Sequence, residues 1–368
     1  MEAPGLHLVF AGGGTGGHLY PALAIADELR RRHPDAVITF AGASGKIESR
    51  VVPGAGYPFV ALWVAGFRRR LSPATLLFPV KLAVAMVQSV ALILRAKPDV
   101  VVGTGGFACG PVVAAAQVLR RRTLLQEQNS IPGATTRILA RRADEVHVTF
   151  EESIRFLPRT DNVRVSGNPT RSALGSVGRE EAAAFFSLDP SKQTVLVFGG
   201  SRGAASINNA VAACAEALAG GGVQIIWQTG EEEFERLRAA PGTGAKGVRM
   251  YPFIGNMEYA YAACDVAVCR AGATSLAELA RTGVPSVLIP YPYAAADHQT
   301  GNARAMEEAG ASLHLRDADA QAHLLPALRA LLGDAPRLRA MADAARRLAR
   351  PGAAAAIADA VERLARAG

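Results

Sequence analysis

The chain has 368 residues, of which 50% are hydrophobic and 20% are charged; this composition excludes a disordered or fibrous protein and predicts two globular domains. Its four cysteines form no Cys-x-x-Cys pair, which excludes a disulfide scaffold and a zinc site of that spacing and favours reduced thiols. The formal net charge of +8 indicates an anionic partner, such as nucleic acid, a phosphorylated ligand or an anionic membrane surface.

Apolar strands alternate with helical patterns along the chain, which predicts an α/β fold with parallel sheets. The first unit is a strand over 6–10, a glycine run, and a helix over about 21–32, where Pro21 suits the first turn. No basic region precedes this apolar run, so we expect no secretory signal. Further strands are predicted over 37–40, 100–102, 123–126, 145–148 and 163–165.

A break at Gly167-Asn168-Pro169 predicts a domain boundary near residue 170. A second alternating series follows it, with strands predicted over 194–198, 223–227, 248–253, 266–269 and 286–289. Near the end of the sequence, Pro351-Gly352 separates two helices rich in Ala, Arg and Leu, over about 335–349 and 353–366.

The positive charge is confined to the first of these two halves. Residues 1–170 hold 20 Lys and Arg against 12 Asp and Glu, whereas residues 171–368 hold 20 of each. A bias toward arginine, with 35 Arg against 5 Lys, does not by itself confine the excess to one half. We therefore expect the N-terminal half to face the anionic partner.

A motif of a strand, a glycine-rich turn and a helix occurs four times, twice in each half of the chain. The turns are residues 11–17, 103–106, 199–203 and 270–275. Glycine permits a close backbone approach, and a helix N-terminus offers unpaired N–H groups that suit phosphate. In open α/β sheets, ligands bind at the carboxyl ends of the strands, where these turns lie. The pattern predicts a ligand cleft between two Rossmann-like domains.

The sequence matches three common nucleotide-binding or metal-binding motifs only in part. Gly12-x-Gly14-x-x-Gly17 matches the dinucleotide fingerprint, but the second predicted strand ends without the carboxylate that NAD binding requires. Gly17 is followed by His18 rather than by the Lys and Ser or Thr of a Walker A loop. Asp317-Ala318-Asp319 resembles a metal-binding Asp-x-Asp, but its place before an Ala-rich helix favours a turn and N-cap.

A largely apolar segment, residues 71–94, follows Arg68, Arg69 and Arg70. Its longest uncharged run, residues 82–94, is shorter than the ~18–20 residues that span a bilayer, so we expect a buried helix there. Residues 71–81 have two interpretations of equal weight: a buried lead-in, or a lipid-surface anchor in which apolar side chains lie beside cations. The anchor would consist of Leu76, Leu77, Phe78 and Val80 beside the three arginines and Lys81.

Seven short motifs in order resemble one family, the UDP-N-acetylglucosamine:undecaprenyl-pyrophosphoryl-MurNAc-pentapeptide N-acetylglucosaminyltransferases of bacterial peptidoglycan synthesis, in glycosyltransferase family 28. They lie at residues 13–18, 105–111, 127–129, 167–171, 199–204, 270–278 and 298–302, and so extend over most of the chain. The resemblance implies a GT-B fold with an acceptor- and membrane-facing domain, residues 1–168, and a UDP-GlcNAc-binding domain, residues 169–349. It also implies that a last helix, about 350–368, packs back on the first domain.

By the same resemblance, Ile254 lies against the uracil and Glu278 binds the ribose hydroxyls. The remaining donor-site residues that it implies are Thr15, Gly16, Gly17, Asn129, Arg171, Ser201, Arg270, Ala273, Thr274, Ser275, His298 and Gln299. Gly105 and Gly106 join the basic and apolar residues around 68–81 as acceptor or membrane contacts. Taken singly, most of these residues are more typical of caps, turns and surfaces, but their joint placement on strand-terminal turns favours a functional role. Arg202 and Thr274 depart from the family's commonest residues, Gln and Leu.

The implied reaction is attack of the MurNAc 4-hydroxyl of lipid I on the anomeric carbon of UDP-GlcNAc, with inversion and loss of UDP. His18 is the first candidate for the base, and its alternative is a structural histidine that caps the glycine turn. Glu127 is the second candidate, and its alternative is a carboxylate that orients Asn129 or a loop. Without a convincing metal cluster, we expect chemistry that needs no metal or other cofactor.

The resemblance implies a peripheral enzyme at the cytoplasmic face of the bacterial plasma membrane, and it leaves open contacts with other cell-wall synthesis proteins. Another GT-B glycosyltransferase with a lipid acceptor is the enzyme alternative. A binding module without catalysis is the alternative from a different class. Nucleic-acid binding is disfavoured, because the chain has two tryptophans and no basic stripe interleaved with aromatic residues.

Overall fold

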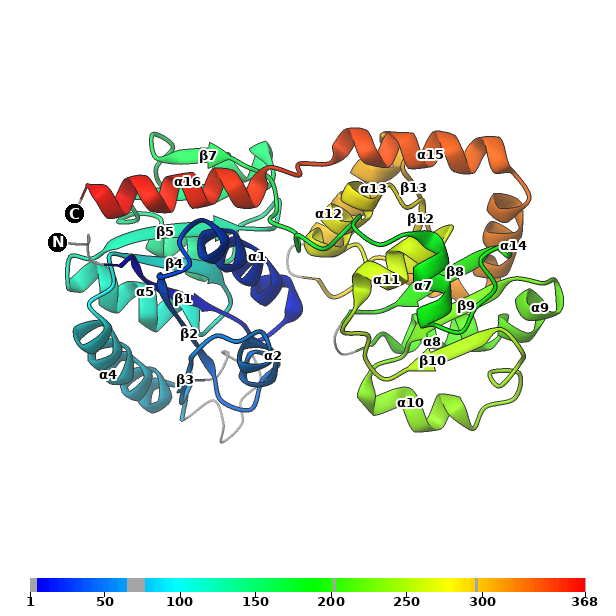
Figure 1. Ribbon diagram of the computed structural model, residues 1–368, viewed down its shortest axis with the longest axis horizontal. Coiled ribbons are helices and arrows are strands. Elements are labelled where there is room, and N and C mark those ends of the chain that lie inside the picture. Colours follow the sequence, from blue (N-terminus) through cyan, green and yellow to red (C-terminus); the bar gives the residue numbers. More distant parts are fainter. Residues whose placement is uncertain (1–4, 65–76, 201–202, 295–296, 368) are drawn as a thin grey trace. The chain divides into compact units, whose positions relative to one another are not determined.

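This computed structural model describes residues 5–64, 77–200, 203–294 and 297–367 (Figure 1). Its contacts divide the chain into two units: unit 1 contains residues 1–172 and 350–368, and unit 2 contains residues 173–349. Each unit is a parallel sheet with helices on both faces, so the α/β fold predicted from the sequence is confirmed (Figure 1).

Unit 1 has a seven-stranded sheet in the order β3-β2-β1-β4-β5-β6-β7. Its strands are β1 (His7–Gly12), β2 (Val37–Ala43), β3 (Phe59–Leu62), β4 (Val100–Gly105), β5 (Arg122–Glu127), β6 (Glu145–Val148) and β7 (Val163–Val165). Its helices are α1 (Gly16–Arg32), α2 (Glu48–Gly54), α4 (Phe78–Ala96), α5 (Cys109–Val118), α6 (Ala134–Leu139), the 3₁₀ helix η1 (Glu151–Phe156) and α16 (Ala353–Arg366).

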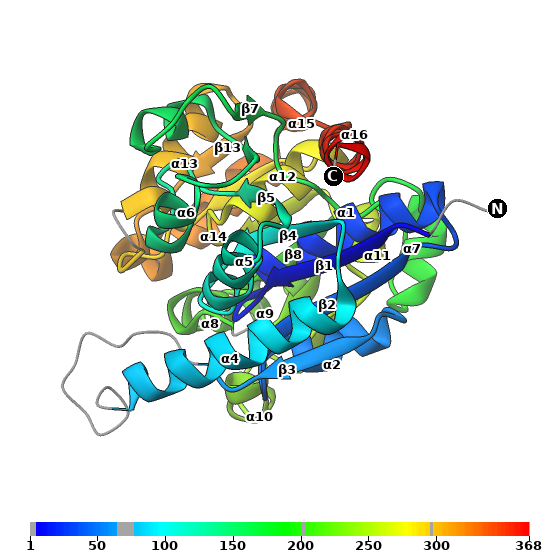
Figure 2. The same ribbon diagram turned by 90° about the vertical axis from the view of Figure 1, so that its left-hand side faces the viewer.

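Strand alternation places the two faces of this sheet in different cores. Leu8 and Phe10 of β1 pack with α1 and α16, whereas Val9 and Ala11 pack with α4 and α5 (Figure 2). Arg32 at the end of α1 donates hydrogen bonds to Asp359 and Glu362 of α16, the second at 3.2 Å. The last helix therefore belongs to the core of unit 1.

Unit 2 has a six-stranded sheet in the order β10-β9-β8-β11-β12-β13. Its strands are β8 (Thr194–Phe198), β9 (Gln224–Gln228), β10 (Val248–Tyr251), β11 (Val266–Cys269), β12 (Ser286–Leu288) and β13 (Ser312–His314). Its helices are α7 (Arg179–Phe185), α8 (Ala205–Ala212), α9 (Ala215–Gly220), α10 (Glu231–Arg238), α11 (Met257–Ala263), α12 (Ala273–Thr282), α13 (His298–Glu308), η3 (Asp317–Asp319), α14 (Ala320–Leu332) and α15 (Ala335–Leu348). One core contains α7, α11, α12 and α13, and the other contains α8, α9 and α14.

Three elements differ from the sequence prediction. Helix α1 begins at Gly16, so Pro21 lies inside the helix and not in its first turn. Strand β10 ends at Tyr251 rather than at residue 253, because Pro252 has no N–H to continue the ladder. Strand β3 is absent from the prediction, since it has only four residues and a single buried one, Leu62.

The prediction of a buried helix over 82–94 is wrong in large part. Helix α4 has 19 residues, and only Ala85, Ser89 and Ile93 are buried. Val87 is 70% exposed, and the exposed set also includes Leu77, Val80, Leu82 and Leu94. By length and composition, this helix of the described chain would be long enough to cross a membrane. The sequence showed an apolar segment, but not that several of its apolar side chains are exposed in the described part of the chain.

Candidate active site

The imidazole of His18 lies on the glycine turn after β4. His18 is in the first turn of α1 and is half-buried. Gly105 and Gly106 have positive φ angles of 95° and 80°, and a Cβ at Gly105 would lie 2.8 Å from His18 Nδ1. Because any side chain at Gly105 would collide with the ring, this glycine allows the histidine to seat against β4. Two glycines predicted as acceptor contacts are therefore packed against the candidate base.

Glu48 holds the first glycine turn from inside unit 1. Its carboxylate is completely buried, and Oε2 accepts a hydrogen bond from the Gly14 amide at 2.9 Å while Oε1 accepts one from the Ala43 amide at 3.0 Å. The Gly14 amide of this glycine turn is therefore already bound within unit 1. A carboxylate of the protein itself occupies that donor.

Thr15, Gly16 and Gly17 begin α1, and Thr15 is the exposed N-cap residue with an extended backbone. Arg171 is half-buried, and its guanidinium carbon lies 4.5 Å from the centre of the Tyr20 ring on α1. The aromatic face attracts the cation and holds the Arg171 side chain against α1. The structure thus brings these predicted residues to the same end of α1.

Glu127 organises the loop after β5. It is 2% exposed, and Oε1 accepts hydrogen bonds from Asn129 N at 3.1 Å and Asn129 Nδ2 at 3.0 Å. Oε2 accepts a third bond from Gly133 N at 3.1 Å. Both carboxylate oxygens therefore accept hydrogen bonds from their own loop. Glu127 thus orients Asn129 and the loop, which was the predicted alternative to a role as base.

The turn from β11 to α12 carries the predicted phosphate contacts of unit 2. Gly272 is the N-cap of α12, Ala273 is buried, and Thr274 and Ser275 are half-buried in the first turn. Backbone N–H groups at a helix N-terminus, together with the helix dipole, attract an anion. Asn302 of α13 donates through Nδ2 to the Ala271 carbonyl at 3.0 Å and thereby fixes the approach to the helix.

Arg270, the first residue after β11, is bound by its own unit. Its guanidinium donates to Asp317, to Ser206 Oγ at 2.8 Å and to the carbonyls of Ile289 and Pro290 at 3.0 and 2.9 Å. The Arg270 side chain is only 12% exposed. Asp317, predicted as a turn and cap residue, begins η3 and instead forms an ion pair with Arg270.

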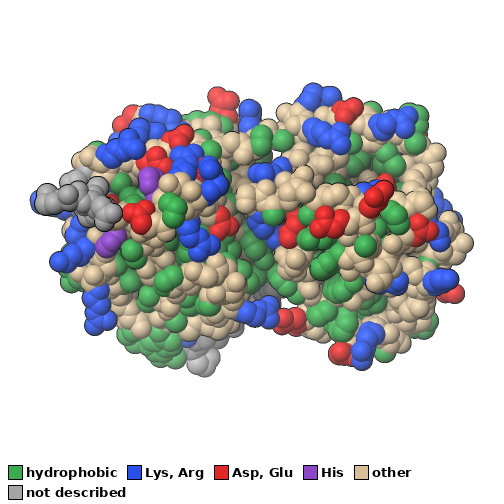
Figure 3. All heavy atoms as spheres, in the orientation of Figure 1, with side chains coloured by type: hydrophobic (Ala, Val, Ile, Leu, Met, Phe, Trp, Pro, Cys, Tyr) green, Lys and Arg blue, Asp and Glu red, His purple; other side chains and the backbone are tan. Residues whose placement is uncertain are grey.

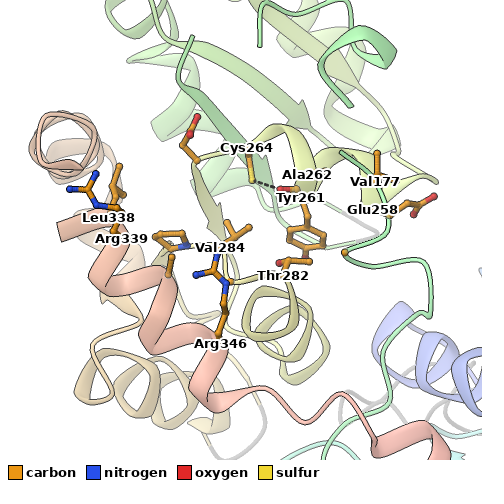
Figure 4. Close-up of a pocket in the computed structure, with 15 residues that line it drawn as sticks. Val177, Glu258, Tyr261, Ala262, Cys264, Thr282, Val284, Leu338, Arg339 and Arg346 are labelled. Atoms are coloured by element: carbon orange, nitrogen blue, oxygen red, sulfur yellow. Dashed lines mark hydrogen bonds between the residues drawn. The ribbon is translucent and has the colours of Figure 1, made fainter. Parts of the chain in front are cut away.

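Glu278 is a buried carboxylate with a buried tyrosine as hydrogen-bond donor. Glu278 is 5% exposed, and its Oε2 accepts the Tyr261 hydroxyl at 3.0 Å. Tyr261 also lines a pocket of about 350 Å³ beside Cys264, Thr282, Val284 and Arg346 (Figure 4). That pocket lies at the amino ends of β11 and β12, at the opposite edge of the sheet from the predicted phosphate contacts.

Ile254 is 5% exposed and belongs to the hydrophobic core of unit 2. Gln228, the last residue of β9, accepts the Ile254 amide through Oε1 at 2.8 Å and donates through Nε2 to the Gly200 carbonyl at 3.0 Å. One buried glutamine therefore joins the predicted uracil contact to the glycine turn after β8. Ser201 and Arg202 lie outside the described residues.

His298 and Gln299 are half-buried and begin α13. Gln299 Oε1 accepts the backbone amide of Tyr291 at 2.9 Å. Tyr291 also stands 5.5 Å from the Arg270 guanidinium, measured to the ring centre. The predicted sugar contacts and the predicted phosphate contacts of unit 2 thus meet at the segment that follows β12.

The predicted membrane contacts are described only in part. Arg68, Arg69, Arg70 and Leu76 lie outside the described residues, whereas Leu77 is exposed and Phe78 half-buried at the start of α4. Lys81 Nζ lies 5.4 Å from the centre of the Trp63 ring. Hydrophobic side chains gather on the surface over α4 (Figure 3). For residues 77–81, the structure therefore agrees with the exposed alternative.

The cysteines and the possible metal ligands can be assessed in the described part of the chain. All four cysteines are free and buried, and burial raises the pKa of Cys109 to about 12 and that of Cys214 to about 11. Thiols of this kind do not form thiolate nucleophiles near neutral pH. Among the described residues, no group of three or more His, Cys, Asp or Glu side chains is placed to hold a metal ion.

Sequence reasoning missed the residues that support the predicted ones: Glu48, Gln228, Tyr261 and Asp317. Their partners lie 34, 26, 17 and 47 positions away, so no local motif contains both members of a pair. The sequence contained only an indirect indication of such supporting residues: a charged or amide side chain near the end of a predicted strand.

Each of the two units matches a domain of a known protein family. The glycosyltransferase family 28 N-terminal domain matches residues 8–148, and the family's C-terminal domain matches residues 194–364. The UDP-N-acetylglucosamine–N-acetylmuramyl-(pentapeptide) pyrophosphoryl-undecaprenol N-acetylglucosamine transferase of Chlorobaculum tepidum is 48% identical over 97% of this chain and 98% of its own length. The protein of the same name from Salinibacter ruber is 45% identical over 99% and 98%.

The solved structure of Acinetobacter baumannii MurG is similar to this one, with a TM-score of 0.71 and 27% identity over 97% of this chain and 99% of that chain. The fold is therefore that of the GT-B glycosyltransferases. Two family domains and near-full-length relatives establish that this chain belongs to glycosyltransferase family 28, in the group of UDP-N-acetylglucosamine–N-acetylmuramyl-(pentapeptide) pyrophosphoryl-undecaprenol N-acetylglucosamine transferases.

Proposed function

We propose that this protein transfers GlcNAc from UDP-GlcNAc to the MurNAc 4-hydroxyl of undecaprenyl-pyrophosphoryl-MurNAc-pentapeptide, lipid I, to give lipid II and UDP. The observation that carries the proposal is the 48% identity over nearly the whole length of a relative that is named for this activity. The side chains that we assign to the reaction come from the strand-terminal turns that the sequence motifs single out.

The acceptor hydroxyl must lose a proton while it attacks the anomeric carbon. His18 takes this proton, because it is half-buried beside the glycine turns of unit 1 and a neutral imidazole carries a nitrogen lone pair that can accept a proton. Glu127 is the weaker candidate, since three donors of its own loop already engage both its oxygens. Attack from the face opposite to UDP inverts the anomeric centre.

The leaving diphosphate accumulates negative charge as its bond to the sugar breaks. The N-terminal amides of α12, with Thr274 and Ser275 in the first turn, supply donors and a positive dipole for this charge. Arg270 adds a fixed positive charge, and Asp317 and Ser206 hold its guanidinium in place. These groups serve the leaving group without a metal ion, so the proposed chemistry is independent of divalent cations.

Glu278 binds the ribose hydroxyls through a carboxylate that Tyr261 orients. A buried carboxylate accepts two hydroxyl hydrogens well, since charge-assisted hydrogen bonds are stronger than neutral ones. Ile254 contributes an apolar surface and Gln228 holds its amide in place, which suits a flat pyrimidine ring. Gln299 selects the sugar hydroxyls at the start of α13.

The protein acts as a peripheral enzyme at the cytoplasmic face of the plasma membrane. Its lipid contact is the exposed side of α4, with Leu77, Val80 and Val87, together with the arginines at 68–70. Apolar side chains enter the interface while cations attract anionic headgroups. The excess of 20 Lys and Arg over 12 Asp and Glu in residues 1–170 places the positive charge in the same half.

The function is tested by UDP release from UDP-GlcNAc with a short-chain lipid I analogue and with its 4-deoxy-MurNAc counterpart. We expect release only with the 4-hydroxyl acceptor, and little release when UDP-glucose replaces UDP-GlcNAc. Equal release with both acceptors contradicts the assigned hydroxyl. Release with a different lipid acceptor alone favours another GT-B glycosyltransferase.

Membrane contact is tested separately by co-sedimentation with vesicles of phosphatidylglycerol and phosphatidylcholine. We expect binding to anionic vesicles to be salt-sensitive and to weaken in the variant Val80→Ser/Val87→Ser. A matched control, Val118→Ser, changes an equally exposed valine on α5 and should bind like the wild type. Unchanged binding of the α4 variant contradicts this surface.

A further inference from the structure

A chain of buried amides leads to the ring of His18. His18 Nδ1 lies 2.8 Å from Gln128 Oε1 and 3.1 Å from the carbonyl oxygen of Thr104. Gln128 is 2% exposed and lies between Glu127 and Asn129, whose functional roles have been considered above. Gln128 itself has no assigned role in the reaction.

The orientation of the Gln128 amide follows from backbone groups that can only accept. Its Nε2 donates to the carbonyl oxygens of Thr104 at 2.8 Å and Gln126 at 3.3 Å, and also to Gln126 Oε1. If the amide were reversed, an oxygen would face these three acceptors in a buried site, at a high cost in free energy. The Gln128 oxygen must therefore face His18.

The orientation of Gln126 follows from that of Gln128, because the Gln128 Nε2 donor requires an acceptor, Gln126 Oε1, opposite it. Gln126 is 1% exposed, and its Nε2 donates to Asn168 Oδ1 at 3.3 Å. Its oxygen is thus directed to Gln128. Buried networks whose members are all satisfied have one preferred arrangement, because any flip leaves a polar atom without a partner.

These contacts determine the tautomer of the histidine. Both neighbours of Nδ1, the Thr104 carbonyl and the Gln128 oxygen, are acceptors, so Nδ1 must be the donor. In neutral imidazole only one nitrogen carries a proton, which leaves the lone pair on Nε2. The carboxylates of the adjacent segments, Glu48 and Glu127, bind backbone amides of Gly14, Ala43, Asn129 and Gly133.

We propose that Gln128 is the positioning residue that holds His18 as the Nδ1–H tautomer, with Nε2 ready to accept the proton of the attacking hydroxyl. This inference rests on the proposed function. In the step, the acceptor oxygen forms its bond to the anomeric carbon and gives its proton to Nε2. The bond from that carbon to UDP breaks, and UDP leaves with the electron pair. Thr104 and Gln128 then stabilise the imidazolium through Nδ1–H.

The tautomer can be measured without any enzymatic assay. Long-range ¹H–¹⁵N correlation spectra of protein labelled with [¹⁵N]histidine distinguish Nδ1–H from Nε2–H, and the His18→Ala variant assigns the His18 signals. We expect the wild type to show His18 as Nδ1–H at a pH where the ring is neutral. A neutral His18 that is Nε2–H overturns the proposal, whatever the substrate of the enzyme is.

Kinetics test the positioning role. We expect Gln128→Met to lower kcat by about 10- to 100-fold with little change in KM for UDP-GlcNAc, because the base is worth about 10²–10⁴ in rate. In a His18→Ala background, the same substitution should change kcat by less than about 2-fold, since no base remains to be positioned. Gln128→Glu, whose neutral acid keeps an acceptor for Nδ1–H and a donor for Thr104, should restore part of the rate.

A matched control removes a different glutamine bond in unit 1. Gln117 of α5 donates to the Leu139 carbonyl at 3.0 Å, a bond outside the His18 network, so Gln117→Met should keep the wild-type kcat. If Gln128→Met lowers kcat equally in the wild-type and His18→Ala backgrounds, Gln128 acts on the fold and the proposal fails. Wild-type kcat in Gln128→Met also contradicts it.

Discussion

Glu48 and Gly14 are joined by a hydrogen bond of 2.9 Å from the Gly14 amide to Oε2 of a completely buried carboxylate. The positive φ of Gly14, 83°, turns that amide inward. Gly13 leaves room for the carboxylate, since a Cβ there would lie 2.4 Å from Glu48 Cδ. The turn that presents His18 is therefore shaped by a residue of α2 and not by its own sequence alone.

Replacing this carboxylate should destabilise unit 1. In Glu48→Gln, an NH₂ group replaces one of the two acceptors that bind Gly14 N and Ala43 N. Leaving a buried donor unpaired costs about 1–3 kcal/mol, so we expect a fall of that size in the free energy of unfolding by urea. The control Glu235→Gln breaks an exposed ion pair with Arg238 and should change it by less than about 1 kcal/mol. Equal stability of Glu48→Gln and wild type would exclude this role.

Tyr261 should affect donor binding through Glu278. Tyr261→Phe keeps the buried ring and removes only the hydroxyl that binds Glu278 Oε2 at 3.0 Å. A hydrogen bond to a charged group contributes about 1.5–3 kcal/mol, so we expect KM for UDP-GlcNAc to rise by about 10-fold with little change in kcat. Tyr57→Phe removes a comparable bond to Asp27 in unit 1 and serves as the control. If both variants share the wild-type KM, Tyr261 does not orient the carboxylate.

The Arg270–Asp317 pair should be required for nucleotide binding. Asp317→Asn removes the charge that faces a guanidinium only 12% exposed, and so frees Arg270 to move. We expect UDP affinity, measured by calorimetry, to fall by about 10-fold, which corresponds to about 1.4 kcal/mol. Asp343→Asn, at an exposed pair with Arg346, is the control and should bind UDP like the wild type. Wild-type affinity in Asp317→Asn would mean that Arg270 acts without this support.

Stability should depend on pH through His147, which is 3% exposed between Ser166 and Glu145. Burial lowers the pKa of His147 from its ordinary value near 6.5, more than Glu145 raises it. The unfolded chain therefore binds the proton first, so this contribution is complete above pH 6.5 and decreases as pH falls through the lowered folded pKa. We expect the free energy of unfolding to fall between pH 7 and pH 5.5, and His147→Asn to show a shallower slope. The same slope in both proteins would refute the assignment.

The sequence predicts the parts of the fold that depend on local pattern. Strands such as β1, β8 and β11 are apolar runs followed by glycine or helix signals, and these patterns are local. Helix α1 was placed five residues too late, because Pro21 was taken as a first-turn residue although the helix begins at Gly16. Strand β3 lies in the apolar run of residues 59–64, which was not predicted as a strand from the sequence.

What the sequence could not predict depends on packing between distant segments. The apolar character of α4 was visible, but its exposure depends on which elements cover it, and only Ala85, Ser89 and Ile93 of the helix are fully buried. The functional motifs predict residues that contact a ligand, such as Glu278 and Arg270. Their partners Tyr261 and Asp317 come from other helices, and the bonds to them exist only once the chain has folded.

The central claim is the transfer of GlcNAc to lipid-linked MurNAc without a metal ion. It is tested most directly by incubating the protein with UDP-[¹⁴C]GlcNAc and a lipid I analogue in detergent and EDTA, and by isolating the lipid product. We predict a labelled disaccharide lipid at the same rate with EDTA as with added Mg²⁺. Tight binding of UDP-GlcNAc without any labelled lipid would contradict the transfer, and label that appears only with Mg²⁺ would contradict the metal-free mechanism.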